Sequence, residues 1–78
     1  MSDSIQKGEK RREKIMIFLS TFINENGYAP SIREIGENVG LSSSSTVFTH
    51  LTKLKSENKI TFAPGLPRTI RVLAENKK

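Results

Sequence analysis

The sequence predicts a mainly α fold with a small β-hairpin, in one domain that covers residues 9–73 of the 78. Apolar residues recur at helical spacing in three separate segments before residue 55. From residue 60 onward, apolar and polar residues alternate instead, which is typical of half-buried strands. Residues 1–8 and 74–78 carry neither pattern, so we expect both ends of the chain to be disordered.

The first helix is predicted over residues 9–25. Its buried stripe consists of apolar residues three and four positions apart, namely Ile15, Phe18, Leu19, Phe22 and Ile23. Asn26-Gly27 ends this helix, because glycine readily takes the left-handed conformation that follows a last helical turn. Ile17 falls on the opposite side of the helix, so we expect its side chain to be exposed.

The second helix is predicted to begin after Ser31. Ser31 and Glu34 have the spacing of a capping box, in which each side chain accepts a hydrogen bond from the other residue's backbone N–H. Gly40 ends the helix. Gly36 costs about 1 kcal/mol relative to alanine inside a helix, so we expect another helix to pass close to it. The buried stripe consists of Ile32, Ile35 and Val39.

A third helix is predicted two or three residues after Gly40, with Ser42 or Ser43 as its cap. Asn58 or Lys59 ends it. Its buried stripe consists of Val47, Leu51 and Leu54. Two helices that are joined by a tight turn containing glycine form a helix-turn-helix.

The last predicted element is a two-stranded hairpin. Apolar residues alternate with Thr61 in residues 60–62 and with Arg71 in residues 70–72. Between these segments, Pro64-Gly65 suits the central positions of a type II turn, and Pro67 limits strand pairing near the tip. Because a hairpin after a helix-turn-helix forms a wing, the sequence as a whole predicts a three-helix winged helix-turn-helix.

Composition narrows the possible functions. Thirteen Lys and Arg against eight Asp and Glu give a net charge of +5, and residues 41–73 hold five basic residues and one acidic residue. This excess favours an anionic partner such as DNA or RNA. The chain has no cysteine and one histidine, His50, which we interpret as packed against the core. We therefore expect no metal site, no cofactor and no enzyme activity. No apolar run is long enough for a membrane span, so we expect a cytoplasmic protein.

The outer face of the third helix carries unusual residues for a surface helix. At about 100° per residue, Ser45, Thr49 and Thr52 point away from the buried stripe, where exposed helices usually carry Glu and Lys. Short hydroxyl side chains let a helix approach base-pair edges, and a threonine methyl can touch a thymine methyl. We interpret this face as a reader of the major groove. A merely flexible, serine-rich turn is the alternative.

The chain resembles the N-terminal DNA-binding domain of the LexA family of SOS repressors, especially its Gram-positive branch, in GYAPSIREIGENVGL, SSSTV and the wing's Pro67, Arg68 and Ile70. The resemblance extends from about residue 11 to residue 72. It implies binding of double-stranded operator DNA and repression of transcription. The base-reading residues that it implies are Ser43, Ser45, Thr46, Phe48 and Thr49. The residues that it implies at the DNA backbone are Ser31, Arg33, Lys53 and Arg68.

Four features depart from the family's pattern, one of which is Glu9 in place of the usual serine or threonine cap of the first helix. Phe48 stands where members usually carry histidine or an acidic residue, and it lies at the edge of the buried stripe. It therefore either packs at the edge of the core or touches thymine methyl groups. Arg71 replaces an acid often found in the second wing strand, which makes it a further candidate for backbone contact. The serine–lysine peptidase domain that dimerises family members has no counterpart in residues 74–78.

From these features we expect a monomer in solution that binds one operator half-site, and two copies can pair on a palindromic operator. A stand-alone protein and an excised domain both remain open. Two classes of function also remain. The first is a DNA-binding regulator of transcription, and the second is a protein-interaction module that interferes with a host repressor through Ile17 and Phe48.

Overall fold

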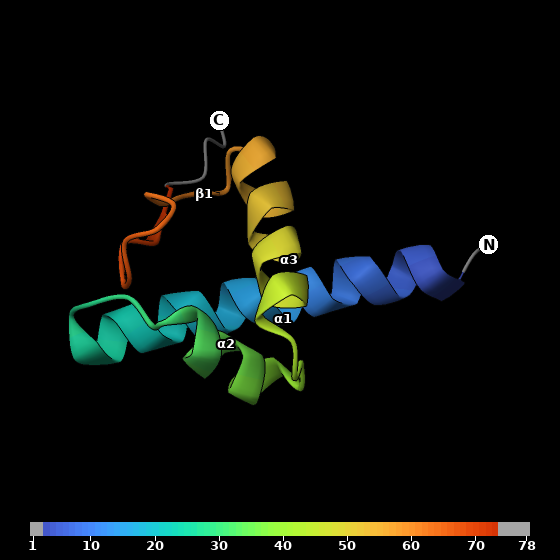
Figure 1. Ribbon diagram of the computed structural model, residues 1–78, viewed down its shortest axis with the longest axis horizontal. Coiled ribbons are helices and arrows are strands. Elements are labelled where there is room, and N and C mark those ends of the chain that lie inside the picture. Colours follow the sequence, from blue (N-terminus) through green and yellow to red (C-terminus); the bar gives the residue numbers. More distant parts are fainter. Residues whose placement is uncertain (1–2, 74–78) are drawn as a thin grey trace.

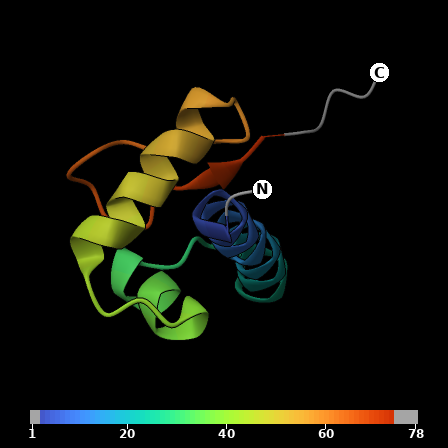
Figure 2. The ribbon, with the colours of Figure 1, turned by 90° about the vertical axis from the view of Figure 1, so that its right-hand side faces the viewer.

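Three helices and a two-stranded antiparallel hairpin follow one another along the chain, which confirms the predicted fold class. The computed structural model describes the backbone of residues 3–73 and the side chains of residues 8–73. The elements are α1 (Asp3–Asn26), α2 (Ile32–Val39), α3 (Ser44–Ser56), β1 (Ile60–Thr61) and β2 (Arg71–Val72). In Figure 1, α3 stands steeply across α1. Figure 2 looks along α1 and shows the other elements grouped on one side of it.

The first helix is longer than the sequence predicted. It begins at Asp3 rather than at residue 9, so the expectation of disorder is wrong for residues 3–8. The helix continues through Gly8 because a single glycine costs only about 1 kcal/mol relative to alanine and no proline interrupts the turns around it. The expected disorder of residues 1–2 and 74–78 lies outside the described residues. No helix within residues 3–73 has the length and hydrophobicity of a membrane span.

The hydrophobic core lies where α1, α2, α3 and the hairpin meet. It is built from the predicted stripes apart from Phe22, whose ring packs against Phe18 and Tyr28 outside the core. Each large aliphatic side chain that the core buries contributes roughly 1.5–3 kcal/mol. Phe18 and Ile23 pack at its edge. Its ten buried hydrophobic residues are Ile15, Leu19, Ala29, Ile35, Val39, Val47, Leu51, Leu54, Ile60 and Ile70.

The turn between α2 and α3 explains the glycine inside α2. Gly40 takes the left-handed conformation, with φ at 78°, and the N–H of Leu41 donates to the carbonyl of Gly36 at 2.9 Å. A Cβ atom at Gly36 would lie 2.7 Å from the carbonyl oxygen of Leu41 and 3.3 Å from Cγ2 of Val47. The expected close approach is therefore present, and it is made first by the turn and then by α3.

The hairpin forms the predicted wing. Ile60 pairs with Val72 and Thr61 with Arg71. Gly65 has a φ of 84°, as the third position of a type II turn requires. The third helix ends at Ser56, earlier than predicted, because Asn58 takes a left-handed conformation that turns the chain toward β1.

One carboxylate joins the wing to the helical part. The predicted capping box is present, since Oε1 of Glu34 accepts from the N–H of Ser31 at 2.8 Å and the N–H of Glu34 donates to Oγ of Ser31 at 3.1 Å. The same carboxylate accepts two hydrogen bonds from Arg68, at 3.0 and 3.3 Å. Arg68 also donates to the carbonyl of Ala29 at 3.0 Å. We call this set, Ala29, Ser31, Glu34 and Arg68, the Glu34 joint.

The Glu34 joint favours the charged carboxylate. The backbone N–H of Ser31, followed by the Arg68 guanidinium, lowers the pKa of Glu34 below its ordinary value. A lowered pKa in the folded state means that ionised Glu34 stabilises the fold. This contribution is fully present above the pKa of an unfolded glutamate, which is about 4.3, and it is lost as the pH falls through the folded-state pKa.

We expect Gly36→Ala to destabilise the domain, although alanine is the better helix former. The added Cβ must displace the Leu41 carbonyl, and overpacking of this kind costs roughly 1–3 kcal/mol. Gly8→Ala in α1 is the matched control, because its Cβ would meet only the flexible Arg12 side chain at 3.5 Å. Urea unfolding measures both variants. A Gly36→Ala variant that gains stability as Gly8→Ala does would contradict the close approach.

We expect Glu34→Gln to lower the thermal midpoint at pH 7 and to make the midpoint less sensitive to acid. The glutamine cannot ionise, so the stability that the wild type loses on acidification is already missing. Thermal unfolding between pH 7 and pH 2 measures both effects. Glu37→Gln is the control, because Glu37 forms only an exposed ion pair with Arg33 at 3.8 Å and should follow the wild-type profile. Parallel pH profiles for wild type and Glu34→Gln would rule out this role of the carboxylate.

Candidate nucleic-acid interface

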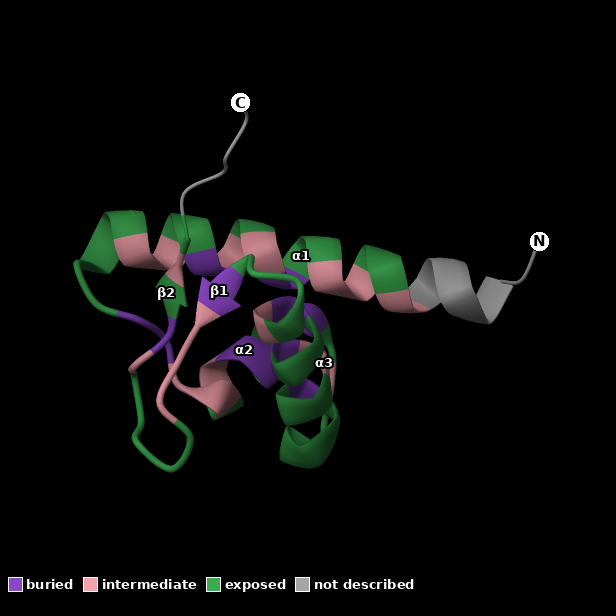
Figure 3. Cartoon of the chain, turned by 90° about the horizontal axis from the view of Figure 1, so that it is seen from above, coloured by how far each residue is buried: buried purple, intermediate pink, exposed green. Residues whose placement is uncertain are grey.

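The outer face of α3 is open to solvent and consists mainly of short hydroxyl side chains. The five base-reading candidates, Ser43, Ser45, Thr46, Phe48 and Thr49, are all exposed. Thr52 continues the face, while Val47, Leu51 and Leu54 are buried beneath it. Figure 3 shows this exposed surface at the end of α3 that projects away from α1. The helical period therefore brings the base-reading candidates together on one element.

The start of α3 identifies which serine caps the helix. Ser43 is the cap, and its Oγ accepts from the N–H of Thr46 at 3.3 Å. The hydroxyl of Thr49, an exposed residue, donates to the carbonyl of Ser45 at 3.0 Å, so its oxygen can still accept a hydrogen bond. Free N–H groups and the positive end of the helix dipole at this terminus suit a phosphate group.

Phe48 lies at the border between α3 and the wing. Its ring packs edge-on against Phe62, with centroids 5.7 Å apart, and Nζ of Lys55 lies 4.7 Å from the centre of the Phe62 ring. This contact matches the interpretation of Phe48 as a residue at the edge of the core. However, 40% of Phe48 remains exposed, so a contact with thymine methyl groups stays a prediction.

Two of the candidates for contact with the DNA backbone form only weak ion pairs within the protein. Arg33 faces Glu37 at 3.8 Å on the exposed side of α2, and Lys53 faces Glu57 at 3.9 Å on α3. Long, exposed ion pairs of this kind contribute little to stability. Both cations can therefore turn to a phosphate at small cost.

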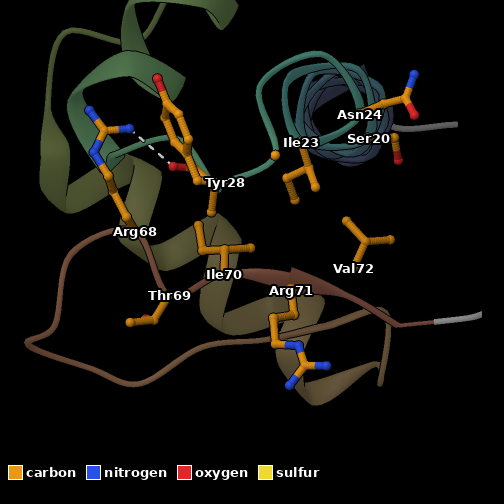
Figure 4. A pocket seen from close by; sticks show the side chains of 11 residues that line it. Ser20, Ile23, Asn24, Tyr28, Arg68, Thr69, Ile70, Arg71 and Val72 are labelled. Carbon is orange, nitrogen blue, oxygen red and sulfur yellow. Dashed lines mark hydrogen bonds between the residues drawn. The ribbon is translucent and has the colours of Figure 1, made fainter.

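Arg68 and Arg71 differ in how they are held. Arg68 belongs to the Glu34 joint, and its guanidinium carbon lies 5.2 Å from the centre of the Tyr28 ring. Figure 4 shows its side chain directed toward the carbonyl of Ala29. Arg71 is exposed on β2 and points to the face opposite Ile70 and Val72. Ser31 and Arg68 thus meet at the joint, while Arg71 lies apart from it.

Two basic residues of α1 also lie against the helix-turn-helix, in addition to the basic residues of its second half. Arg11 donates to the carbonyl of Val39 at 3.3 Å, and Nη1 of Arg12 lies 3.3 Å from Nδ1 of His50. Burial, followed by the charges of Arg12 and Arg11, lowers the pKa of His50. His50 is thus partly buried, as expected. The positions of both arginines, three and four residues before Ile15, could have predicted this contact.

No group of three or more histidine, cysteine, aspartate or glutamate side chains within the described part of the chain is arranged to hold a metal ion.

Comparison with known proteins identifies the family. The model of the LexA DNA-binding domain matches residues 6–69. The chain is 44% identical over 73 residues to the LexA repressor of Bacillus mycoides (strain KBAB4), covering 94% of this chain and 36% of that protein. Identity to the LexA repressors of Bacillus thuringiensis (strain Al Hakam) and Bacillus anthracis is also 44%, over 94% of this chain and 35% of each of them. The chain thus spans about a third of the length of these relatives. It belongs to the LexA DNA-binding domain family.

Proposed function

We propose that this chain binds specific double-stranded DNA and represses transcription, with α3 in the major groove. The observation that carries the proposal is the exposed hydroxyl face of α3, where Ser45, Thr49 and Thr52 lie above a buried apolar stripe. Such a face is slim enough for base-pair edges. The family assignment supports the same function, because the relatives are LexA repressors and this chain corresponds to their DNA-binding domain.

The proposed contacts fall into two groups. Base edges are read by the exposed residues at the start of α3, which are Ser43, Ser45, Thr46, Phe48 and Thr49. Phosphates are held by residues at the start of α2, on α3 and in the wing, which are Ser31, Arg33, Lys53, Arg68 and Arg71. Arg68 differs from the other cations, because it must leave the carboxylate of Glu34 to reach a phosphate. We therefore assign it a smaller share of the phosphate binding than Lys53.

A second candidate function is a protein-interaction module that interferes with a host repressor. The observation in its favour is Ile17, which is 66% exposed on α1. A surface of this kind would use the α1 side of the molecule and would require no DNA. The two functions therefore differ in their dependence on salt and in the use of Ile17, whereas Phe48 is a proposed contact in both.

The DNA-binding proposal predicts a steep dependence of affinity on salt. If Arg33, Lys53 and Arg71 neutralise about three phosphates, log K should fall with log salt with a slope of about −3. Fluorescence anisotropy on a duplex selected from a randomised pool measures the slope. Lys53→Ala should make the slope shallower by about one unit and weaken all sequences alike. A flat response would favour the protein-interaction module instead.

Replacement of hydroxyl groups on α3 should lower the discrimination between DNA sequences and leave the salt dependence of binding unchanged. We expect Ser45→Ala and Thr49→Ala to lose roughly 1–3 kcal/mol of discrimination between the selected duplex and a scrambled one, at an unchanged salt slope. Competition binding with both duplexes measures the loss. Ser56→Ala, at the far end of the same helix, is the matched control and should keep full discrimination. If the hydroxyl variants instead weakened both duplexes equally, α3 would not be the reading helix.

We further expect a monomer that binds one half-site weakly and two half-sites more tightly. The sequence has no cysteine and no heptad repeat that would hold a dimer, whereas two-fold operators allow paired binding by such motifs. Sedimentation at tens of micromolar protein measures the free state, and titration of one against two half-sites measures pairing. A stable dimer without DNA would contradict this expectation.

A further inference from the structure

The outer edge of β2 has no strand partner among residues 3–73. The sheet consists of two strands, so β1 covers only one edge of β2. The N–H of Leu73 donates to the carbonyl of Lys59 at 2.9 Å, and the hydrogen bonds of an antiparallel ladder involve alternate residues. The N–H and C=O groups of Ile70 and Val72 therefore point away from β1. An edge of this kind is a template for a further strand.

A groove of about 830 Å³ lies between β2 and the second half of α1. Five consecutive residues, 68–72, line it, whereas a strand that offered only one face would contribute alternate residues. Figure 4 shows Ile70 and Val72 directed toward α1, where Ile23 faces them, and Arg71 directed the opposite way. The groove therefore combines a backbone edge with an apolar floor.

The lining of the groove is positively charged. Arg68 and Arg71 belong to it, and no aspartate or glutamate is among the described residues that line it. Arg68 is held by Glu34 at 3.0 Å. Arg71 is exposed and forms no ion pair within the described part of the chain. The charge of Arg71 favours an acidic group on whatever occupies the groove.

We propose that the groove binds an extended peptide segment of a partner protein, which adds to β2 as an antiparallel third strand. In this mode of recognition, main-chain hydrogen bonds supply affinity and the alternate side chains supply specificity. Side chains on neighbouring strands pair on the same face of a sheet. The peptide residue opposite Arg71 is therefore acidic, and its two neighbours, opposite Ile70 and Val72, are apolar. The recognised pattern is apolar–acidic–apolar.

The peptide site goes beyond the proposed DNA binding and does not depend on it. Arg71 is also a proposed phosphate contact, so DNA and the peptide would share this side chain. The backbone edge and the apolar floor serve only the peptide. The two uses of Arg71 are separated by measuring peptide binding in the absence of DNA.

The probe is the acetylated and amidated peptide Ser-Thr-Val-Glu-Val-Thr-Ser, titrated into the full 78-residue chain. Amide NMR shifts report the contact residue by residue. We expect saturable binding, with the largest shifts at Ile70 and Val72. The control peptide Ser-Val-Val-Glu-Thr-Thr-Ser has the same composition and charge but breaks the alternation. It should bind several-fold more weakly, because its valines point to opposite faces of the sheet.

N-methylation of the peptide tests the strand geometry without altering the protein. In an antiparallel third strand, the N–H groups of the two valines donate to Ile70 and Val72, and the N–H of the glutamate points outward. Methylation of both valine nitrogens should therefore abolish binding. Methylation of the glutamate nitrogen should leave the affinity within about twofold of the original, because that N–H makes no bond to β2.

A charge exchange tests the role of Arg71. Arg71→Glu should bind the peptide about tenfold more weakly, and a peptide with lysine in place of glutamate should restore the affinity. Lys14→Glu is the matched control, because Lys14 is exposed on α1 and does not line the groove. This variant makes the same change in net charge and should bind the original peptide as the wild type does.

Three outcomes would overturn the inference. They are a lack of saturable binding at millimolar peptide, equal binding of the two methylated peptides, and equal weakening by Arg71→Glu and Lys14→Glu. If the peptide failed to bind while Arg71→Glu weakened binding to DNA, Arg71 would be a phosphate contact only. That result would refute the peptide site and leave the proposed function intact.

Discussion

The geometry of this domain depends on the carboxylate of Glu34. One of its oxygens completes the capping box of α2, and both accept hydrogen bonds from Arg68 in the wing. The wing has only two residue pairs in its ladder, and short hairpins are marginally stable alone. Strand pairing alone would leave the wing marginally stable. The Glu34 joint stabilises it by holding the hairpin against the start of the helix-turn-helix. The third helix, α3, and the wing tip keep a defined relation because of it.

The Glu34 joint also determines which side chains remain available for the proposed interface with DNA. Arg68 is occupied within the protein, so the charge expected at the wing is turned inward and the tip is left apolar. Weakly paired cations remain on α2 and α3, at Arg33 and Lys53, while hydroxyl groups cover the start of α3. In the proposed complex, cations set the salt dependence and hydroxyls set the sequence preference.

Close packing sets a second constraint. A domain this small buries only about 60% of the surface of its unfolded chain, so its margin of stability is narrow. In the turn between α2 and α3, the Leu41 carbonyl lies so close to Gly36 that even a methyl group at this position would not fit. This contact fixes the path from α2 into α3. Because the buried stripe holds α3 in place, its exposed face does not need residues of high helix propensity.

The sequence by itself determined the elements whose causes are local. Capping boxes, glycine stops, helical stripes and the Pro-Gly turn each involve residues within a few positions of one another, and all of them were predicted. The boundaries of α1 and α3 were less accurate, because glycine and asparagine are tolerated both inside and after helices. Only the tertiary structure decided the contacts of Arg68 with Glu34 and of Arg12 with His50, which join residues 34 and 38 positions apart. A charged side chain in a sequence shows no preference between a phosphate and a distant carboxylate, since that choice depends on which groups folding brings within a few ångströms.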